Sequence, residues 1–326
     1  MLSRIASRFK NARPKSDGSD FVGELDGMSA KHFSRKSAAS KSSITARSAS
    51  NPQFQPLQGL NNISSATHQV SGTRHRMEDF SVSCAIDETT AMFGVFDGHG
   101  GQQCSQFFVQ NLPRIVRAEF DKGQNDESNW GQVLRKSLQT CGQMWDKDPA
   151  SHRSAGTVGV VVLVSGSNYT VAHVGDCGVV ASAPGPTTFL ALTTPHHAKN
   201  TMEKERILQL GGKVEDDRLM GVLCPSRAFG NLDLRSLPGG QSLVSECDIV
   251  DQTIQLDHDN QGFLIIASDG VWDIYSPAEA SKIVSNSLAK HGSASIAATT
   301  LATHAARSNM DDVTVTVVFW KAPNVV

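Results

Sequence analysis

The sequence lacks the cysteine patterns that build disulfide frameworks and zinc sites. Its six cysteines are scattered between positions 84 and 247, and no two of them form a Cys-x-x-Cys pair. Disulfide-rich domains and structural zinc sites use closer, regular spacings. We therefore expect reduced thiols and an intracellular, reducing compartment.

Long apolar runs and a strong charge excess are also missing. No stretch of about 18 apolar residues occurs, which is the length that a membrane-spanning helix needs, and the N-terminus lacks the continuous apolar segment of a secretory signal. The formal net charge is −2 at pH 7, whereas nucleic-acid-binding proteins usually carry a strong basic excess. We expect neither a membrane span nor a nucleic-acid partner.

Two familiar enzyme motifs are absent. None of the six cysteines begins a Cys-x₅-Arg sequence, so the tyrosine phosphatases that use a cysteine nucleophile are disfavoured. No Gly-x₄-Gly-Lys-Ser/Thr loop occurs either, so nucleotide hydrolysis of the P-loop type is disfavoured.

Residues 1–60 differ in composition from the rest of the chain. They are rich in Ser, Ala, Lys and Arg and contain few large apolar residues, so we expect a flexible N-terminal tail. The first 15 residues contain no acid, a weak likeness to an organelle transit peptide. We expect a cytoplasmic protein, with a nuclear location or organelle targeting by this tail as the alternatives.

Residues 61–322 have the pattern of one folded domain, followed by a short C-terminal end at 323–326. The sequence as a whole is 39% hydrophobic and 19% charged, which supplies a sizeable core. Short apolar or β-branched runs predict buried strands at 91–96, 157–164, 169–174, 179–181, 263–267 and 312–320. Apolar residues spaced three or four apart predict helices at 129–147, 202–210 and 277–288.

Acidic residues occur where several of these strands end or begin, at Asp97, Asp176, Asp269 and Asp311. Around Asp176 the pattern predicts a strand, a glycine-bounded turn and a second strand, as in a hairpin. Each acid alone is better explained as a turn former. Together, they could converge on one rim of a sheet, where carboxylates repel one another unless cations neutralise them. Oxygen ligands without supporting cysteines favour Mg²⁺ or Mn²⁺.

Six short motifs occur in order between Ser71 and Trp320. They are Arg-x-x-Met-Glu-Asp at 74–79, Asp-Gly-His-x-Gly at 97–101, Val-Gly-Asp at 174–176, Ser-Arg-Ala-Phe-Gly at 226–230, Ala-Ser-Asp-Gly at 267–270 and Asp-Asp-Val-Thr-Val at 311–315. In these motifs the sequence resembles the metal-dependent protein serine/threonine phosphatases of the type 2C class. One such motif would be weak, but an ordered series over about three quarters of the chain is specific.

The resemblance implies both a fold and an activity for residues 61–322. The fold would be an α+β, four-layer α-β-β-α sandwich, with two mostly antiparallel sheets flanked by helices. The activity would be the hydrolysis of phosphoserine and phosphothreonine in protein substrates. A water activated at a centre of two Mn²⁺ or Mg²⁺ ions, with a weaker third ion, would attack the phosphorus. We expect such an enzyme to be a monomer.

The resemblance also assigns the metal ligands residue by residue. They correspond here to Asp97, the carbonyl of Gly98, Asp269, Asp311, Glu78 and Asp176. Asp97 would bridge both ions, and Glu78 would serve the second through water. Asp269 would help to hold the first ion and, with Asp176, the weaker third.

Two further residues would act on the substrate. Arg74 would bind the phosphate, because a guanidinium matches two phosphate oxygens, and His99 would protonate the departing alkoxide. By contrast, His196 and His197 lie outside the motifs, and we expect them at the surface. Asp79 is predicted to be structural, holding helix or turn amides.

The sequence departs from the family pattern at Ser154-Ala155-Gly156-Thr157, Cys177-Gly178, Asn231 and Asp312. The family usually has Asp in place of Asn231 and Asn in place of Asp312, a change that could alter how Asp311 is oriented. Two alternatives stay open, namely an inactive family member that acts as a scaffold or binding module, and a metal hydrolase of small phosphoesters. Retention of Asp97, Asp269 and Asp311 argues against a scaffold, which has no need of a charged cluster.

Overall fold

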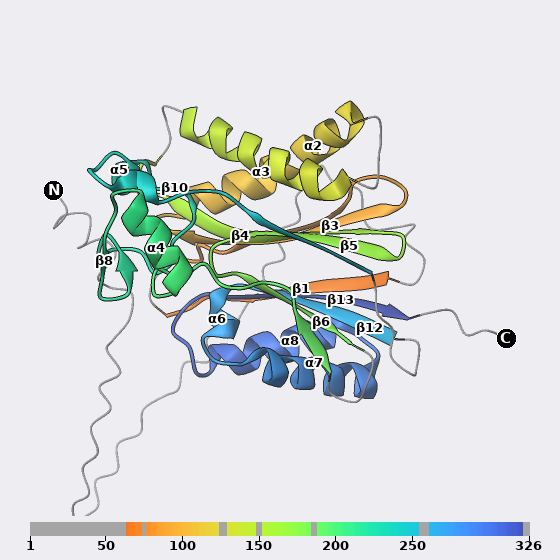
Figure 1. Cartoon of the computed structure of the whole chain (residues 1–326). Coiled ribbons are helices and arrows are strands. Elements are labelled where there is room, and N and C mark those ends of the chain that lie inside the picture. The colour runs from red at the N-terminus through yellow and green to blue at the C-terminus, as the bar shows by residue number, and fades with distance from the viewer. Residues whose placement is uncertain are drawn as a thin grey trace, which may run out of the picture.

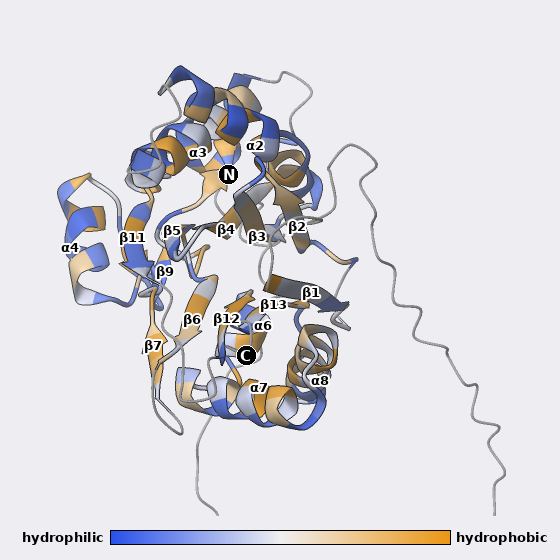
Figure 2. Ribbon diagram, turned by 90° about the vertical axis from the view of Figure 1, so that its right-hand side faces the viewer, coloured by the Kyte–Doolittle hydropathy of each residue, from blue (hydrophilic) through white to orange (hydrophobic). Residues whose placement is uncertain are grey.

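The computed structural model describes residues 63–73, 76–123, 129–147, 152–183, 188–253 and 261–321. The expected tail at 1–60, the C-terminal end at 323–326 and Arg74 therefore lie outside the described residues. The described residues form four layers, with two β-sheets face to face and a pair of helices on each outer side (Figure 1). Figure 2 shows the same layers from the side.

The first sheet has the strand order β11-β5-β4-β3-β2, with β10 beside β4. Its strands are β2 Phe80–Ala85, β3 Thr90–His99, β4 Gly156–Ser165, β5 Asn168–Val174, β10 Phe229–Gly230 and β11 Asp248–Thr253. Two helices cover its outer face, α2 Gln103–Lys122 and α3 Trp130–Lys147.

The second sheet has the order β1-β13-β12-β6-β7. Its strands are β1 Ile63–Val70, β6 Gly178–Ser182, β7 Phe189–Ala191, β12 Gln261–Ala267 and β13 Val313–Lys321, and its helices are α7 Pro277–His291 and α8 Ala294–Ala306. Neighbouring strands of both sheets are antiparallel. The predicted α+β sandwich with antiparallel sheets is therefore confirmed.

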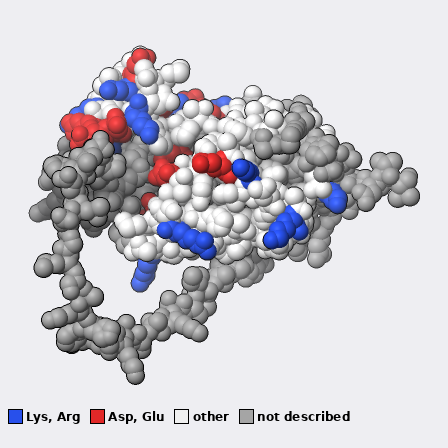
Figure 3. Space-filling model, turned by 90° about the horizontal axis from the view of Figure 1, so that it is seen from below, with Lys and Arg blue, Asp and Glu red and all other residues white. Residues whose placement is uncertain are grey.

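The described residues also form shorter elements, namely α4 Thr201–Gln209, the two-stranded β8 Val214–Glu215 and β9 Arg218–Leu219, α5 Leu232–Arg235, the 3₁₀ turn η2 Gly240–Ser242 and α6 Asp269–Trp272. Of these, α4, β8 and α5 lie together at one end of the sandwich (Figure 1). In the part of the chain that the structure describes, no helix is both long and apolar enough to cross a membrane. Figure 3 shows the outer side of α7 and α8. Most atoms of this face belong to uncharged residues, and its Lys and Arg side chains are separated from one another.

The core follows from the two-residue period of the strands. In β3, Phe93 and Val95 pack between the two sheets, whereas Met92 and Phe96 point to the other side. There Phe96 meets Phe108 of α2, with the ring centroids 5.5 Å apart. Because both faces of the central strands are covered, they read as continuous apolar runs.

One predicted supersecondary unit is wrong. The hairpin expected around Asp176 does not form, because β5 belongs to the first sheet and β6 to the second. The chain crosses between the sheets at Gly175, whose φ of 93° suits glycine. Asp176 thus lies at the crossing, beside both sheets.

Candidate active site

The site begins at the end of β3, which runs beyond the predicted apolar segment. Asp97, Gly98 and His99 remain paired with β4, opposite Val158, Thr157 and Gly156 in that order. The Thr157 hydroxyl donates a hydrogen bond of 2.9 Å to the Asp97 carbonyl. Alternate residues of a strand share a face, so Asp97 and His99 lie on the same side as the inter-sheet core.

Gly98 allows a second segment to approach β3 closely. A Cβ atom here would lie 2.5 Å from the Glu78 carbonyl oxygen and 2.6 Å from Ser105 Oγ. Ser105 Oγ, at the start of α2, donates a 2.6 Å hydrogen bond to that carbonyl. The absence of a side chain at 98 therefore brings Glu78 beside Asp97.

Asp312 holds the same segment from the other side. Its two carboxylate oxygens accept the backbone N–H groups of Gly72 and Glu78, each at 2.7 Å. An asparagine has one carbonyl oxygen and would turn an NH₂ group toward one of these donors. This departure from the family pattern therefore gives each amide its own acceptor. The Asp312 N–H also donates to Asp311 Oδ1 at 3.1 Å.

Acids from four other segments gather around Asp97. Burial raises the pKa of Asp97 well above its ordinary value, and the negative charges of Asp79, Asp269, Asp176 and Asp311 raise it further. The structure thus brings together the four strand-end acids that the sequence singles out. They come from the end of β3, the crossing at 176, the start of α6 and the loop before β13.

Glu78 and Asp79 join this group. Burial, then Asp312 and Asp311, raise the pKa of Glu78 to about 7, against the weaker opposing effect of a hydrogen bond from the Gly101 backbone. Burial and Asp312 likewise raise the pKa of Asp79 to about 7. Asp79 is buried and bonds to the hydroxyl of Ser268 at 2.8 Å, as well as to Thr314. These partners are side chains rather than the backbone amides expected from the sequence.

The donors in this cluster fit divalent cations that prefer oxygen. Six carboxyl groups, those of Glu78, Asp79, Asp97, Asp176, Asp269 and Asp311, either bear on the pKa of Asp97 or have their own pKa raised. Crowded acids either keep protons or bind cations. Mg²⁺ and Mn²⁺ take carboxylate and carbonyl oxygens.

Metal binding should weaken as the pH falls from about 8 to about 6. The raised pKa values of Glu78 and Asp79 mean that both groups are mostly ionised at the higher pH and mostly protonated at the lower one. A cation bound in the cluster favours the ionised form of both groups, whether or not they touch it, and so releases their protons. Each proton released lowers the apparent affinity about 10-fold per pH unit below the pKa. Calorimetric titration with Mn²⁺ in two buffers of different ionisation enthalpy measures affinity and proton release together.

The matched control for that titration is Glu78→Gln, which should release fewer protons. An affinity that does not change with pH, together with no proton release, would contradict the raised pKa values.

His99 is anchored by a residue far away in the sequence. Its Nε2 lies 2.8 Å from Oδ1 of Asn231. Burial lowers the pKa of His99, and this hydrogen bond and the charge of Asp176 partly offset the effect. The structure therefore places His99 beside the acid cluster, on the same strand as Asp97.

The prediction of a surface position is wrong for His196, whereas His197 is half-buried. His196 is 4% exposed, and it binds Gly175 twice, through its own N–H to the Gly175 carbonyl at 2.9 Å and through Nδ1 from the Gly175 N–H at 3.0 Å. His197 Nε2 lies 3.4 Å from Asp176 Oδ2. Both histidines thus support the crossing that carries Asp176. The motifs gave no signal of this, because the contacts depend on how the two sheets meet.

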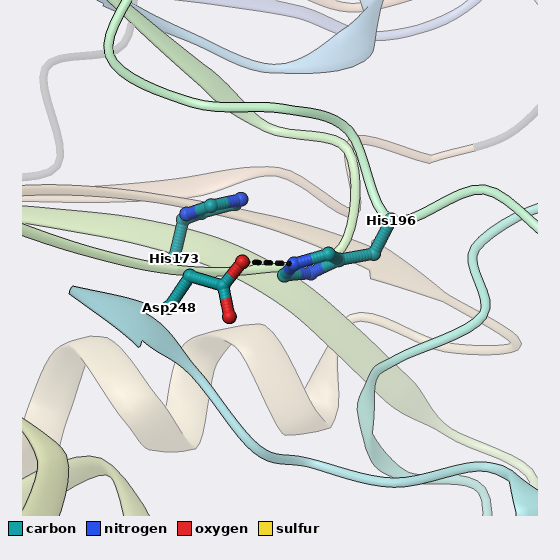
Figure 4. A group of neighbouring side chains, drawn as sticks. All are labelled: His173, His196 and Asp248. Atoms are coloured by element: carbon teal, nitrogen blue, oxygen red, sulfur yellow. Dashed lines mark hydrogen bonds and ion pairs between the residues drawn. The ribbon is translucent and has the colours of Figure 1, made fainter. Parts of the chain in front are cut away.

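His196 also belongs to a group with His173 and Asp248 that has the composition of a metal site (Figure 4). Potential ligand atoms of the three residues lie within 4.8 Å of one another. However, Nδ1 of His196 accepts the Gly175 N–H, so its proton sits on Nε2 and is donated to Asp248 Oδ2 at 3.1 Å.

Two further features oppose metal binding there. The rings of His173 and His196 are stacked, 4.5 Å apart and 10° from parallel, so their in-plane lone pairs cannot converge on one ion. Arg227 occupies the other Asp248 oxygen at 3.1 Å. The group acts as a hydrogen-bonded support for the Gly175–Asp176 crossing.

Comparisons with known proteins agree with this geometry. A family model described as Protein phosphatase 2C matches residues 59–314. The chain is 31% identical over 287 residues to the probable protein phosphatase 2C 2 of Oryza sativa subsp. japonica, covering 82% of this chain and 72% of the rice protein. It is 30% identical over 235 residues to protein phosphatase 1L of Bos taurus, covering 68% of this chain and 63% of the bovine protein.

Solved structures show the same fold. The crystal structure of serine-threonine phosphatase 2C from Toxoplasma gondii matches with a TM-score of 0.66 at 21% identity, covering 80% of this chain and 96% of that chain. The structure of a C. elegans sex determining protein matches with a TM-score of 0.69 at 22% identity, covering 80% of this chain and 65% of that chain. Since the family model spans well over half of the sequence, the chain belongs to the protein phosphatase 2C family and is a metal-dependent phosphoprotein phosphatase.

Proposed function

We propose that this enzyme hydrolyses phosphoserine and phosphothreonine in proteins by direct attack of water, with two Mn²⁺ or Mg²⁺ ions and a weaker third. The observation that carries the proposal is the convergence of carboxyl groups on Asp97, with its pKa raised by burial and by four neighbouring acids. When bound, the cations would acidify water and offset negative charge on the phosphate.

Particular residues would hold the ions. They are Asp97, the Gly98 carbonyl, Asp269, Asp311, Glu78 and Asp176. The hydrogen bonds of Asp312 to the Glu78 backbone and of His196 to Gly175 keep two of these ligands in place.

Two residues would act on the substrate itself. Arg74 would bind two phosphate oxygens through its guanidinium. His99 would donate a proton to the serine or threonine oxygen as its bond to phosphorus breaks, because that oxygen leaves as a strong base. No covalent bond between enzyme and substrate is needed.

The direct test is an assay of the purified chain on phosphoserine, phosphothreonine and phosphotyrosine peptides. We expect turnover of the first two with Mn²⁺ or Mg²⁺, little turnover of phosphotyrosine, and none with EDTA. Turnover that persists in EDTA would overturn the metal-dependent mechanism. Activity on small phosphoesters but not on peptides would overturn the proposed substrate class, and no activity at all would favour a scaffold.

Deleting residues 1–60 should leave kcat on a short phosphopeptide within about twofold, because the tail lacks core-forming residues and all the motifs. The contrasting variant is a deletion of 1–70, which also removes β1. That strand pairs with β13 from Ile63 to Val70, opposite Trp320 to Val313, so its loss should lower solubility and thermal stability sharply. A large loss of activity in the shorter deletion would show that the tail contributes to the domain.

We also propose an intracellular, cytoplasmic monomer. All six cysteines are free, and five of them are buried, which fits a reducing compartment. Light scattering of the full chain after size exclusion tests the monomer, and imaging of a tagged full-length chain tests the compartment.

A further inference from the structure

Asn231 occupies an unusual backbone position next to the active site. It is 1% exposed, and its φ of 53° and ψ of 43° place it in the left-handed region, directly before α5. Asparagine tolerates this region better than most residues with a side chain. Its N–H donates to the Ala155 carbonyl at 2.9 Å. The backbone conformation therefore aims the side chain at the end of β3 rather than along α5.

The hydrogen bonds of Asn231 determine how its amide is oriented. Nδ2 donates to the Ser154 carbonyl at 3.2 Å, which turns Oδ1 toward His99 Nε2 at 2.8 Å. A carboxamide oxygen can only accept, so Nε2 of His99 must carry the proton in this pair. One ring nitrogen is thus committed to Asn231, so the proton given to the leaving oxygen must come from Nδ1 of the doubly protonated ring, which returns to the neutral form with Nε2–H still bound to Asn231.

Gly156 shelters this hydrogen bond. A Cβ atom on Gly156 would lie 2.2 Å from Asn231 Oδ1 and 2.6 Å from His99 Nε2. Gly156 stands opposite His99 in the β3–β4 ladder, so the hydrogen bond passes directly over its Cα. Any side chain here would separate the two partners.

Besides its backbone pairing with β4, His99 needs a support for its side chain, because it lies at the end of a strand. His99 is the last residue of β3, and Gly100 and Gly101 follow with positive φ values of 69° and 131°. The two residues that follow His99 are therefore glycines, which restrict the backbone conformation least. A misplacement of about 1 Å in a reacting group can cost roughly 100-fold in rate.

We infer that Asn231 is a positioning residue for proton donation, which holds the His99 ring through a hydrogen bond that only glycine at 156 permits. The inference rests on the proposed role of His99 as the proton donor. An uncharged anchor also adds no further carboxylate beside the acids that gather around Asp97.

The test compares two substrates in three variants at saturating Mn²⁺. Asn231→Gly removes the acceptor without straining the left-handed backbone, Gly156→Ala separates the partners and leaves both intact, and Asn231→Asp keeps an acceptor oxygen. For the first two, we expect kcat on a phosphoserine peptide to fall about 10–100-fold. Turnover of p-nitrophenyl phosphate, whose leaving group scarcely needs a proton, should fall less than about threefold. Asn231→Asp should retain more peptide turnover than Asn231→Gly.

A double variant shows whether Asn231 acts through His99. Adding Asn231→Gly to His99→Gln should cause no further loss on the peptide, since the group being positioned is gone. An additional loss in the double variant, equal losses on both substrates in Asn231→Gly, or no loss at all would each overturn the inference. Thermal unfolding and Mn²⁺ affinity of each variant identify a loss that comes from misfolding, and if Gly156→Ala does not fold, the Asn231 variants decide.

The design separates this inference from the function on which it rests. If His99→Gln itself slows both substrates equally, the proposed proton donation fails, and the inference fails with it. If His99→Gln is selective for the peptide but Asn231→Gly is not, the proton donor stands and the inference alone is wrong.

Discussion

Replacing Asp97 with Asn should nearly abolish turnover while the domain stays folded. Asp97 is the acid on which four other carboxyl groups converge, and we propose that it bridges both metal ions. Losing one preorganised group that stabilises developing charge typically costs about 10²–10³-fold, and a shared ligand should cost at least as much. Asp269→Asn should behave in the same way.

The measurement is kcat on a phosphothreonine peptide across a range of Mn²⁺ concentrations, with circular dichroism as the check on folding. Asp121→Asn is the charge-matched control, because Asp121 pairs with Arg117 on the exposed side of α2 and should leave kcat unchanged. Substantial Mn²⁺-dependent activity in Asp97→Asn would show that the ions are held elsewhere.

The same two variants should unfold at a higher temperature than the parent chain when metal is removed with EDTA. Each removes one carboxyl group from a cluster in which burial, and then the charges of neighbouring acids, raise the pKa of Asp97. Mn²⁺ should reverse the order, since the parent chain alone keeps the full ligand set. Equal or lower unfolding temperatures of the variants in EDTA would mean that these acids do not repel one another in the folded state.

Replacing His99 with Gln should slow phosphopeptide turnover about 10²–10⁴-fold, the range that a positioned acid contributes. Serine and threonine leave as strongly basic alkoxides, which gain from a proton during bond breaking. An aryl phosphate such as p-nitrophenyl phosphate releases a far more stable anion. The loss on the aryl substrate should therefore be much smaller.

The comparison uses kcat at saturating Mn²⁺, so that weaker metal binding is not mistaken for lost proton transfer. Glutamine keeps some hydrogen-bonding capacity but cannot act as a comparable acid. The variant therefore measures the loss of proton donation separately from the loss of hydrogen bonding. Equal losses on both substrates, at unchanged Mn²⁺ affinity, would mean that His99 positions water or metal instead.

Local patterns were enough to predict most of the central strands and three helices. The continuous β-branched run at 157–164 became β4, which is buried throughout. Pro277 does begin α7. Ser276, directly before the helix, and Glu279, in its first turn, form a capping box. These features depend on neighbours a few residues apart, which the sequence displays directly.

Two long helices, α2 and α8, were not predicted. In α2 the buried Cys104, Phe108 and Leu112 recur every four residues, so a usable signal was present. Pro113 in its interior works against a helix, and packing against β2, β3 and α3 outweighs it. In α8 the buried face is mostly alanine, which marks no clear apolar stripe.

The identities and order of the strand-end acids can be taken from the sequence, and the ordered motifs are enough to predict the family and its sandwich fold. Three features depend on the folded chain: β5 and β6 lie in different sheets, Asp312 holds Glu78 across 234 positions, and Asn231 reaches His99 across 132. Strand and helix patterns arise from residues close in the chain, whereas these contacts form only when the two sheets pack face to face. The pKa of about 7 at Glu78 has the same origin, because burial and neighbouring acids from distant segments produce it.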